Sequence, residues 1–222
     1  MQRGIEGRKI FLKKQDYSRF VLGLELFNSD NSVTLWNLFA RSNRVVFQER
    51  LEEFRQETKK SLVELLAFAL MPNHFHFIIR EIRRGGTSEF MKKMGGYASY
   101  FNEQYNRSGA LFQSRYKLIP VEDERQLRVL FSYVHTNPVA LWEPGWKDFR
   151  VRNAKEAFEK LEDYRWSSYR DYIGMPTYPK VTQRDFFLEI FDGEADCKAW
   201  IEDWVRFKAE NASIVLGPAF LE

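Results

Sequence analysis

Two apolar runs joined by a three-residue turn constrain the fold of this chain more than any other feature. The run ELLAFAL is followed by Met71, Pro72 and Asn73, and then by HFHFIIRE. Proline and asparagine favour the backbone conformations of tight turns, and each run has the length and apolar content of a buried strand. The segment therefore predicts an antiparallel β-hairpin.

The second run of the predicted hairpin carries two of the chain's three histidines, His74 and His76. Because side chains two apart on a strand point the same way, both imidazoles leave one face, whereas Phe75, Phe77 and Ile79 leave the other. The two imidazoles are then close enough to bind one divalent ion and leave its other positions open, which is typical of a catalytic metal site. The alternative is a pair of hydrogen-bonded or surface histidines.

A second group of polar residues lies in FSYVHTNP, at the end of a helix expected from about Asp123 and stopped by Asn137 and Pro138. Tyr133 and Asn137 are one turn apart and share a face, whereas His135 lies about 200° around the helix from Tyr133. If that face looks onto the histidine strand, Asn137 offers a metal an oxygen and Tyr133 offers a phosphate a phenol. The alternatives are an ordinary helix end and a packing tyrosine.

The remaining segments predict an α+β fold, in which helices cover one side of an antiparallel sheet. Short strands are expected around Ile10 to Leu12 and in VTLWNLFA, and ALFQSRYKLIPV is expected to be extended. Helices are expected from near Asp16, in RVVFQERLEEFRQETKKS, over residues 89–105, and in NAKEAFEKLEDY, TQRDFFLEIF and ADCKAWIEDWVRFKAE.

Positive charge is concentrated in the middle of the chain. Between Arg80 and Lys117 there are eight basic and three acidic residues, a net charge of +5 against +3 for the whole protein. Tyrosine and phenylalanine alternate with these charges, a mixture that suits phosphate contacts and base stacking on single-stranded nucleic acid. A solvated face beside ordinary core aromatics is the alternative.

Composition favours a cytoplasmic protein with one substantial core. The chain has 222 residues, 44% of them hydrophobic, and its single cysteine rules out an internal disulfide framework. We find no signal-like N-terminal stretch and no apolar run long enough for a membrane span.

Three blocks of the sequence resemble a known family. MPNHFHFIIR, FMKKMGGYASYFNEQYNRSGALFQSRYK and YVHTNPVALW, in this order and spacing, resemble the single-tyrosine transposases of the HUH superfamily, including the REP-associated tyrosine transposases. The likeness extends roughly from Arg3 to Tyr172, with RGIEGRKIF and DYRWSSYRDYIG at its two ends. We therefore expect a transposase domain over residues 1–172 and a helical extension of unknown role over residues 173–222.

The resemblance implies a ferredoxin-like fold with a metal-assisted active site. His74 and His76 would bind Mg²⁺ or Mn²⁺, Asn137 would be a third ligand, and Tyr133 would be the nucleophile. A free phenol with a pKa near 10 needs activation, which a metal on the scissile phosphate would supply. Attack would leave a 5′-phosphotyrosine and a free 3′-hydroxyl, and rejoining would need no ATP.

For the substrate, the resemblance implies single-stranded DNA that folds into a hairpin. The best-placed contacts on the basic segment are Arg107, Gln113, Arg115 and Lys117. Alternatively, Arg107 pairs with Glu103, and Arg115 and Lys117 only face solvent. His135 is assigned to structure, with a substrate contact as the alternative.

Other expectations distinguish this chain from its relatives. The first strand would be short, because its family counterpart usually begins before the position of Met1, and the region 28–60 is longer than in compact REP-associated members. Some relatives are dimers with shared active sites, and we expect a homodimer. The competing functions are an inactive DNA-binding protein that keeps the basic surface, and a rolling-circle replication initiator or relaxase.

Overall fold

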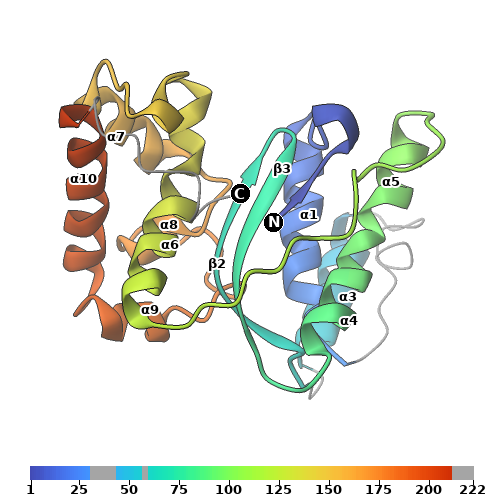
Figure 1. Ribbon diagram of the computed structural model, residues 1–222. Helices are drawn as coiled ribbons and strands as arrows, with labels where there is room; N and C mark the ends of the chain where they lie inside the picture. The colour runs from blue at the N-terminus through green and yellow to red at the C-terminus, as the bar shows by residue number, and fades with distance from the viewer. Residues whose placement is uncertain (31–43, 57–59, 212–222) are drawn as a thin grey trace. The chain divides into compact units, whose positions relative to one another are not determined.

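The computed structural model describes residues 1–30, 44–56 and 60–211, and these form two compact units (Figure 1). Unit 1 consists of residues 1–10, 65–78 and the described part of 112–222. Unit 2 consists of the described part of residues 11–64 together with residues 79–111. Among the described helices, none has the length and apolar character that a membrane crossing requires.

The predicted hairpin is confirmed. Strand β2 (Val63–Met71) and strand β3 (His74–Glu81) are joined at the Pro72–Asn73 turn, and β1 (Gln2–Arg3) pairs antiparallel with β3, so the described sheet has the order β1-β3-β2. Figure 1 shows β2 and β3 as two long adjacent arrows. The half of the hairpin near the turn belongs to unit 1 and its far ends belong to unit 2. This antiparallel sheet with its helices confirms the predicted α+β class.

Unit 1 is built around the amphipathic helix α6 (Glu124–Thr136), which begins where Asp123 accepts a hydrogen bond from the backbone of Gln126. It runs into the 3-10 helix η2 (Asn137–Leu141), where Pro138 is tolerated in the first turn. The elements that follow are η3 (Trp146–Asp148), α7 (Ala154–Asp163), α8 (Tyr169–Tyr172), α9 (Asp185–Ile190) and α10 (Glu194–Glu210). Helix α10 packs against α6 and α7.

The core of unit 1 joins the sheet to these helices. Leu66 and Ala67 of β2 and Ile78 of β3 pack with Phe131 and with residues of α8, α9 and α10. The helices beyond residue 172 thus share one core with α6. The predicted functional division at residues 172 and 173 stays a prediction.

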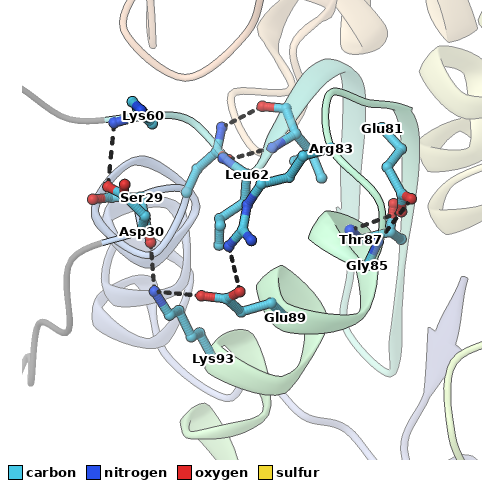
Figure 2. Close-up of polar contacts among 12 residues, drawn as sticks. Ser29, Asp30, Lys60, Leu62, Glu81, Arg83, Gly85, Thr87, Glu89 and Lys93 are labelled. Carbon is cyan, nitrogen blue, oxygen red and sulfur yellow. Dashed lines mark hydrogen bonds and ion pairs between the residues drawn. The ribbon is translucent and has the colours of Figure 1, made fainter.

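Unit 2 contains α1 (Lys14–Leu26), α3 (Arg44–Gln56), α4 (Gly86–Gly95) and α5 (Tyr97–Gln104). Figure 2 shows how side chains hold the start of α4, where the carboxylate of Glu81 accepts hydrogen bonds from the backbone of Gly85 and Thr87. Further along α4, Lys93 donates to the carbonyl of Ser29.

The start of α1 depends on Asp16, which is 1% exposed. One carboxylate oxygen accepts from the backbone of Leu12 and Lys13 at 2.8 and 2.9 Å. The hydroxyls of Tyr100 and Tyr105 donate to the same carboxylate at 2.9 and 2.7 Å. A single buried charge therefore joins α1 to the end of α5.

The prediction of a strand around Ile10 to Leu12 is wrong. The first strand is β1 at Gln2–Arg3, and residues 10–12 form no strand. The 3-10 helix η1 (Ile5–Gly7) follows, with Glu6 and Gly7 in the left-handed region at φ 53° and 72°, and it turns the chain away from the sheet. Ile10 then donates its backbone N–H to the carbonyl of Pro72. Both Ile10 and Phe11 are buried, so their burial does not alternate as in a half-buried strand.

The segment predicted to be extended contains no regular strand, and it bends at Leu111 and at residues 113–115. Phe112 forms an isolated bridge with Gly4, and the backbone N–H groups of Gln113 and Lys117 donate to the carbonyls of Arg3 and Met1. This segment thus runs along β1. The strand expected in VTLWNLFA, residues 33–40, lies outside the described residues.

Candidate active site

Strand β3 brings the two histidines of HFHFIIRE together on one face, as the alternation predicted. Their rings lie edge to face, with centroids 5.0 Å apart. Phe75 and Phe77, on the intervening positions, stack with each other at 4.7 Å. The histidine pair therefore belongs to a strand whose opposite face is aromatic.

The imidazole of His74 is held between two asparagines. Its Nδ1 lies 2.7 Å from Oδ1 of Asn73, and its Nε2 lies 3.2 Å from Oδ1 of Asn137. Burial lowers the pKa of His74 to about 4, although the contact with Asn137 acts in the opposite direction. At neutral pH the ring is therefore neutral and carries a single N–H. Each contact is to an amide oxygen, so the neutral ring can donate to only one of them; a hydrogen on Nδ1, donated to Asn73, would leave the lone pair of Nε2 available to a metal.

His76 carries a buried nitrogen that nothing else in the described chain satisfies. The residue is 6% exposed, and its Nε2 has no hydrogen-bond partner among the described residues. Burial, and secondarily the neighbouring His74, lower the pKa of His76 well below its usual value, so this ring is neutral as well. An unpaired buried acceptor costs free energy, which is the pattern expected of an atom that binds a ligand.

Helix α6 and the start of η2 supply the other two candidate residues. The ring of Tyr133 lies edge-on to that of His76, with centroids 5.1 Å apart. Asn137 is 5% exposed and also hydrogen-bonds to Tyr133. Burial raises the pKa of the Tyr133 phenol, and the hydrogen bond from Asn137 opposes that rise. The shared face expected of Tyr133 and Asn137 is thus the face that looks onto the histidine strand.

These residues fit a divalent ion by the chemistry of their donors. With the hydrogen on Nδ1 of each ring, the two Nε2 atoms would present lone pairs, and Asn137 adds an amide oxygen beside one of them. The contact between Nδ1 of His74 and Asn73 is the kind of outer hydrogen bond that orients a metal-binding imidazole. The site has only two histidines, and among the described residues no group of three or more histidine, cysteine or acidic side chains gathers in a way that would hold a metal.

The charges that act on the histidine pair are positive. Lys147 and the α-amino group lower the pKa of both His74 and His76, and Arg3 lowers that of His74. Arg3 is also the cross-strand partner of His74 in the pairing of β1 with β3. Sequence reasoning missed Arg3 and Lys147. The register of β1 would have revealed Arg3, but the first strand was expected at Ile10 to Leu12.

The predicted DNA contacts fall into both units. Gln113, Arg115 and Lys117 are exposed in unit 1, on the segment that runs along β1. In the described sheet β1 lies next to β3, so β1 separates this segment from the histidine strand. Arg107 belongs to unit 2, where it donates to Oδ1 of Asn102 at 2.7 Å and to the carbonyl of Ala110. This arrangement differs from the alternative pairing with Glu103.

The third histidine has a structural environment. His135 is 0% exposed, and its Nε2 lies 2.7 Å from Oγ of Ser168. Its ring packs between Phe131 and the tyrosines of α8. Burial lowers the pKa of His135 to about 3.

The histidine pair of β3, the tyrosine of α6 and the asparagine of η2 thus lie together within unit 1. Residues 39–137 match the family model described as "Transposase IS200 like", and this segment contains His74, His76, Tyr133 and Asn137. This segment, somewhat less than half of the chain, is therefore similar to IS200-like transposases, as the sequence resemblance predicted. Neither curated proteins nor solved structures gave a match.

Proposed function

We propose that this protein nicks and rejoins single-stranded DNA through a covalent bond between Tyr133 and a 5′-phosphate. One observation carries the proposal: Nε2 of His76 is buried without a hydrogen-bond partner among the described residues, and the centroid of the Tyr133 ring lies 5.1 Å from that of His76. The candidate metal ligand His76 and the candidate nucleophile Tyr133 are thus neighbours within one chain.

His74, His76 and Asn137 would hold Mg²⁺ or Mn²⁺ through two ring nitrogens and an amide oxygen. Both imidazoles are neutral at physiological pH because of their lowered pKa values, so neither needs to lose a proton before binding a cation. When bound, the ion supplies Lewis-acid polarisation of the scissile phosphate.

Tyr133 would act as the nucleophile. Its oxygen forms a bond to phosphorus while the bond from phosphorus to the 3′-oxygen breaks, and the phenol's proton is balanced by the proton that the leaving oxygen gains. The products are a 5′-phosphotyrosine and a 3′-hydroxyl, and the reverse attack rejoins a strand. Since burial raises the pKa of Tyr133, the hydrogen bond from Asn137 matters, because it stabilises the phenolate.

The substrate would be single-stranded DNA near a hairpin, contacted by Gln113, Arg115 and Lys117 beside β1 and by Arg107 on unit 2. The exposed positions of the first three support this role. A homodimer in the cytoplasm remains our expectation, and the contact of Tyr133 with His76 favours a site made within one subunit.

The test is covalent capture. The full chain is incubated with a short hairpin-containing single strand and Mn²⁺, and the products are separated on a denaturing gel. We expect a protein–DNA adduct from the natural sequence and none from Tyr133→Phe. An adduct of equal yield in Tyr133→Phe would refute the assigned nucleophile.

The two competing functions give other results. An inactive DNA-binding protein would retain the strand without forming an adduct under any metal condition. A replication initiator or relaxase would also form the adduct, but inverted repeats flanking the gene would favour transposition over that alternative.

A further inference from the structure

The exposed cations around the histidine pair have no role in the proposal above. Arg3 and Lys147 are both exposed, and both lie outside the segment that matches the transposase family. Yet they are the two side-chain cations whose charges reach His74. We propose that Arg3 and Lys147 bind the phosphate of the DNA strand at the histidine pair and hold it for attack. This inference rests on the proposed function, whose substrate it positions.

The register of the sheet fixes Arg3 beside the metal-binding candidates. In the antiparallel pairing, Arg3 lies directly opposite His74. Directly opposed residues project from the same face, with Cβ atoms about 4.5–5.5 Å apart. The guanidinium of Arg3 therefore leaves the same face as both imidazoles. Its planar fork suits two oxygens of one phosphate.

The backbone of Arg3 is also tied to the predicted DNA contacts. Its carbonyl accepts a hydrogen bond of 2.9 Å from the backbone of Gln113. Arg3 thus lies between the segment that carries Arg115 and Lys117 and the strand that carries His74. A strand of DNA that follows these basic residues toward the histidines would pass Arg3.

Lys147 belongs to η3, which packs against η2, the 3-10 helix that begins with Asn137. Lys147 lies between Trp146 and Phe149, which are both buried at 5% exposure. The carbonyl of Trp146 accepts a hydrogen bond of 3.1 Å from Lys208 of α10, and the Lys208 ammonium lies 4.5 Å from the centroids of both aromatic rings. The backbone on either side of Lys147 is therefore fixed, while its ammonium stays in solvent.

The cations around the two neutral imidazoles favour the binding of an anion beside them. Within the described part of the chain, the charges that act on His74 and His76 are those of Arg3, Lys147, the α-amino group and His74 itself. A surface of one sign of charge raises the local concentration of an oppositely charged substrate. The ligand class is therefore a phosphodiester, and the side chains that recognise it are Arg3 and Lys147.

The test is the salt dependence of DNA binding, because each phosphate contact adds a defined amount to the slope of log affinity against log salt concentration. The affinity of the full chain for a fluorescent hairpin-containing single strand is measured in EDTA over a series of salt concentrations. We expect Arg3→Gln and Lys147→Gln each to reduce the slope of log affinity against log salt by about 0.7, the value of one contact with single-stranded DNA. Lys155→Gln is the matched control, since Lys155 is an exposed α7 lysine whose charge is not among those acting on the histidines.

A second readout follows the reaction. With Mn²⁺, we expect the rate of adduct formation to fall about tenfold to a hundredfold in Arg3→Gln, the loss typical of one hydrogen bond to a charged group. Arg3→Lys should keep the salt slope and recover only part of the rate, because it keeps the charge and loses the fork.

The experiments distinguish a failure of the phosphate-binding role of Arg3 and Lys147 from a failure of the proposed function. If the natural sequence forms the adduct but the Arg3 and Lys147 variants share the slope and rate of Lys155→Gln, this inference is overturned and the proposed function stands. If the natural sequence forms no adduct, the proposed function fails, while a reduced slope in the two variants would still support phosphate binding at the histidine pair.

Discussion

The ring of His76 lies edge-on to the ring of Tyr133, with centroids 5.1 Å apart and planes at 89°. This geometry brings the positive edge of one ring toward the face of the other, a stable aromatic arrangement. The same imidazole carries a buried nitrogen that has no hydrogen-bond partner in the part of the chain that the structure describes. Packing against Tyr133 needs only an aromatic ring at position 76, whereas metal binding needs the ring nitrogen. A substitution that keeps the ring and removes the nitrogen therefore separates the two roles.

Replacing His76 by phenylalanine should abolish metal binding without lowering stability. The variant keeps an aromatic ring against Tyr133 and removes a buried acceptor that has no partner among the described residues. We expect the free energy of unfolding in urea to stay unchanged or rise by about 1 kcal/mol. Calorimetric titration with Mn²⁺ in the absence of DNA should show no binding.

The matched control is His135→Phe. His135 is also buried and its Nδ1 has no hydrogen-bond partner among the described residues, but its Nε2 is paired with Ser168. Losing this hydrogen bond should lower the free energy of unfolding by about 1–3 kcal/mol and leave Mn²⁺ binding intact. Equal destabilisation by both substitutions would contradict the idea that His76 is held for a ligand.

Removing the side chain of Asn73 should weaken metal binding without touching a ligand. Oδ1 of Asn73 lies 2.7 Å from Nδ1 of His74 and orients that ring. We expect Asn73→Ala to lower the Mn²⁺ affinity about tenfold, as for other residues that orient metal-binding histidines. Asn73→Asp keeps an acceptor for the Nδ1 hydrogen and should bind Mn²⁺ nearly as the natural sequence does. An Asn73→Ala variant of unchanged affinity would remove this residue from the site.

Folding stability should decrease as pH falls below about 6.5. The pKa of His135 is about 3 in the folded protein and about 6.5 in an unfolded chain. Between these two pH values the unfolded state binds more protons than the folded state. The contribution of His135 to the free energy of unfolding is therefore complete above pH 6.5 and is lost as pH falls toward 3.

The corresponding slope is measurable by urea unfolding between pH 5 and pH 6.5, where it should approach about 1.4 kcal/mol per pH unit for His135. His135→Phe should remove that part of the slope, whereas the part due to His74 remains. A variant whose pH dependence matches that of the natural sequence would show that His135 does not titrate in this way.

The carboxylate of Asp16 should be a main stabilising group of unit 2. It accepts two backbone hydrogen bonds at the start of α1 and two tyrosine hydroxyls. Asp16→Asn has one acceptor oxygen instead of two, so we expect a loss of about 2–4 kcal/mol of unfolding free energy. Tyr105→Phe removes one of the four bonds and should cost about 1 kcal/mol. Thermal unfolding of the two variants compares these effects; an Asp16→Asn protein as stable as Tyr105→Phe would argue against the cluster.

Local pattern was enough to predict the elements that hold the candidate site. The alternation in HFHFIIRE predicted that His74 and His76 share a face, and the one-turn separation of Tyr133 and Asn137 predicted that they share another. Both follow from the fixed periods of strands and helices. The same reasoning failed at Ile10 to Leu12, because two adjacent buried side chains there pack around a turn rather than within a strand.

The sequence by itself determined the hairpin, most of the helices and the residues for which we propose phosphate chemistry, because periodicity and turn residues act over short stretches of chain. Only the tertiary structure decided that the face of Tyr133 meets His76, that Asn137 turns its oxygen to His74, and that Arg3 lies opposite His74. These contacts join residues far apart in the chain. They depend on how β1, β3 and α6 pack, and no local pattern records that packing.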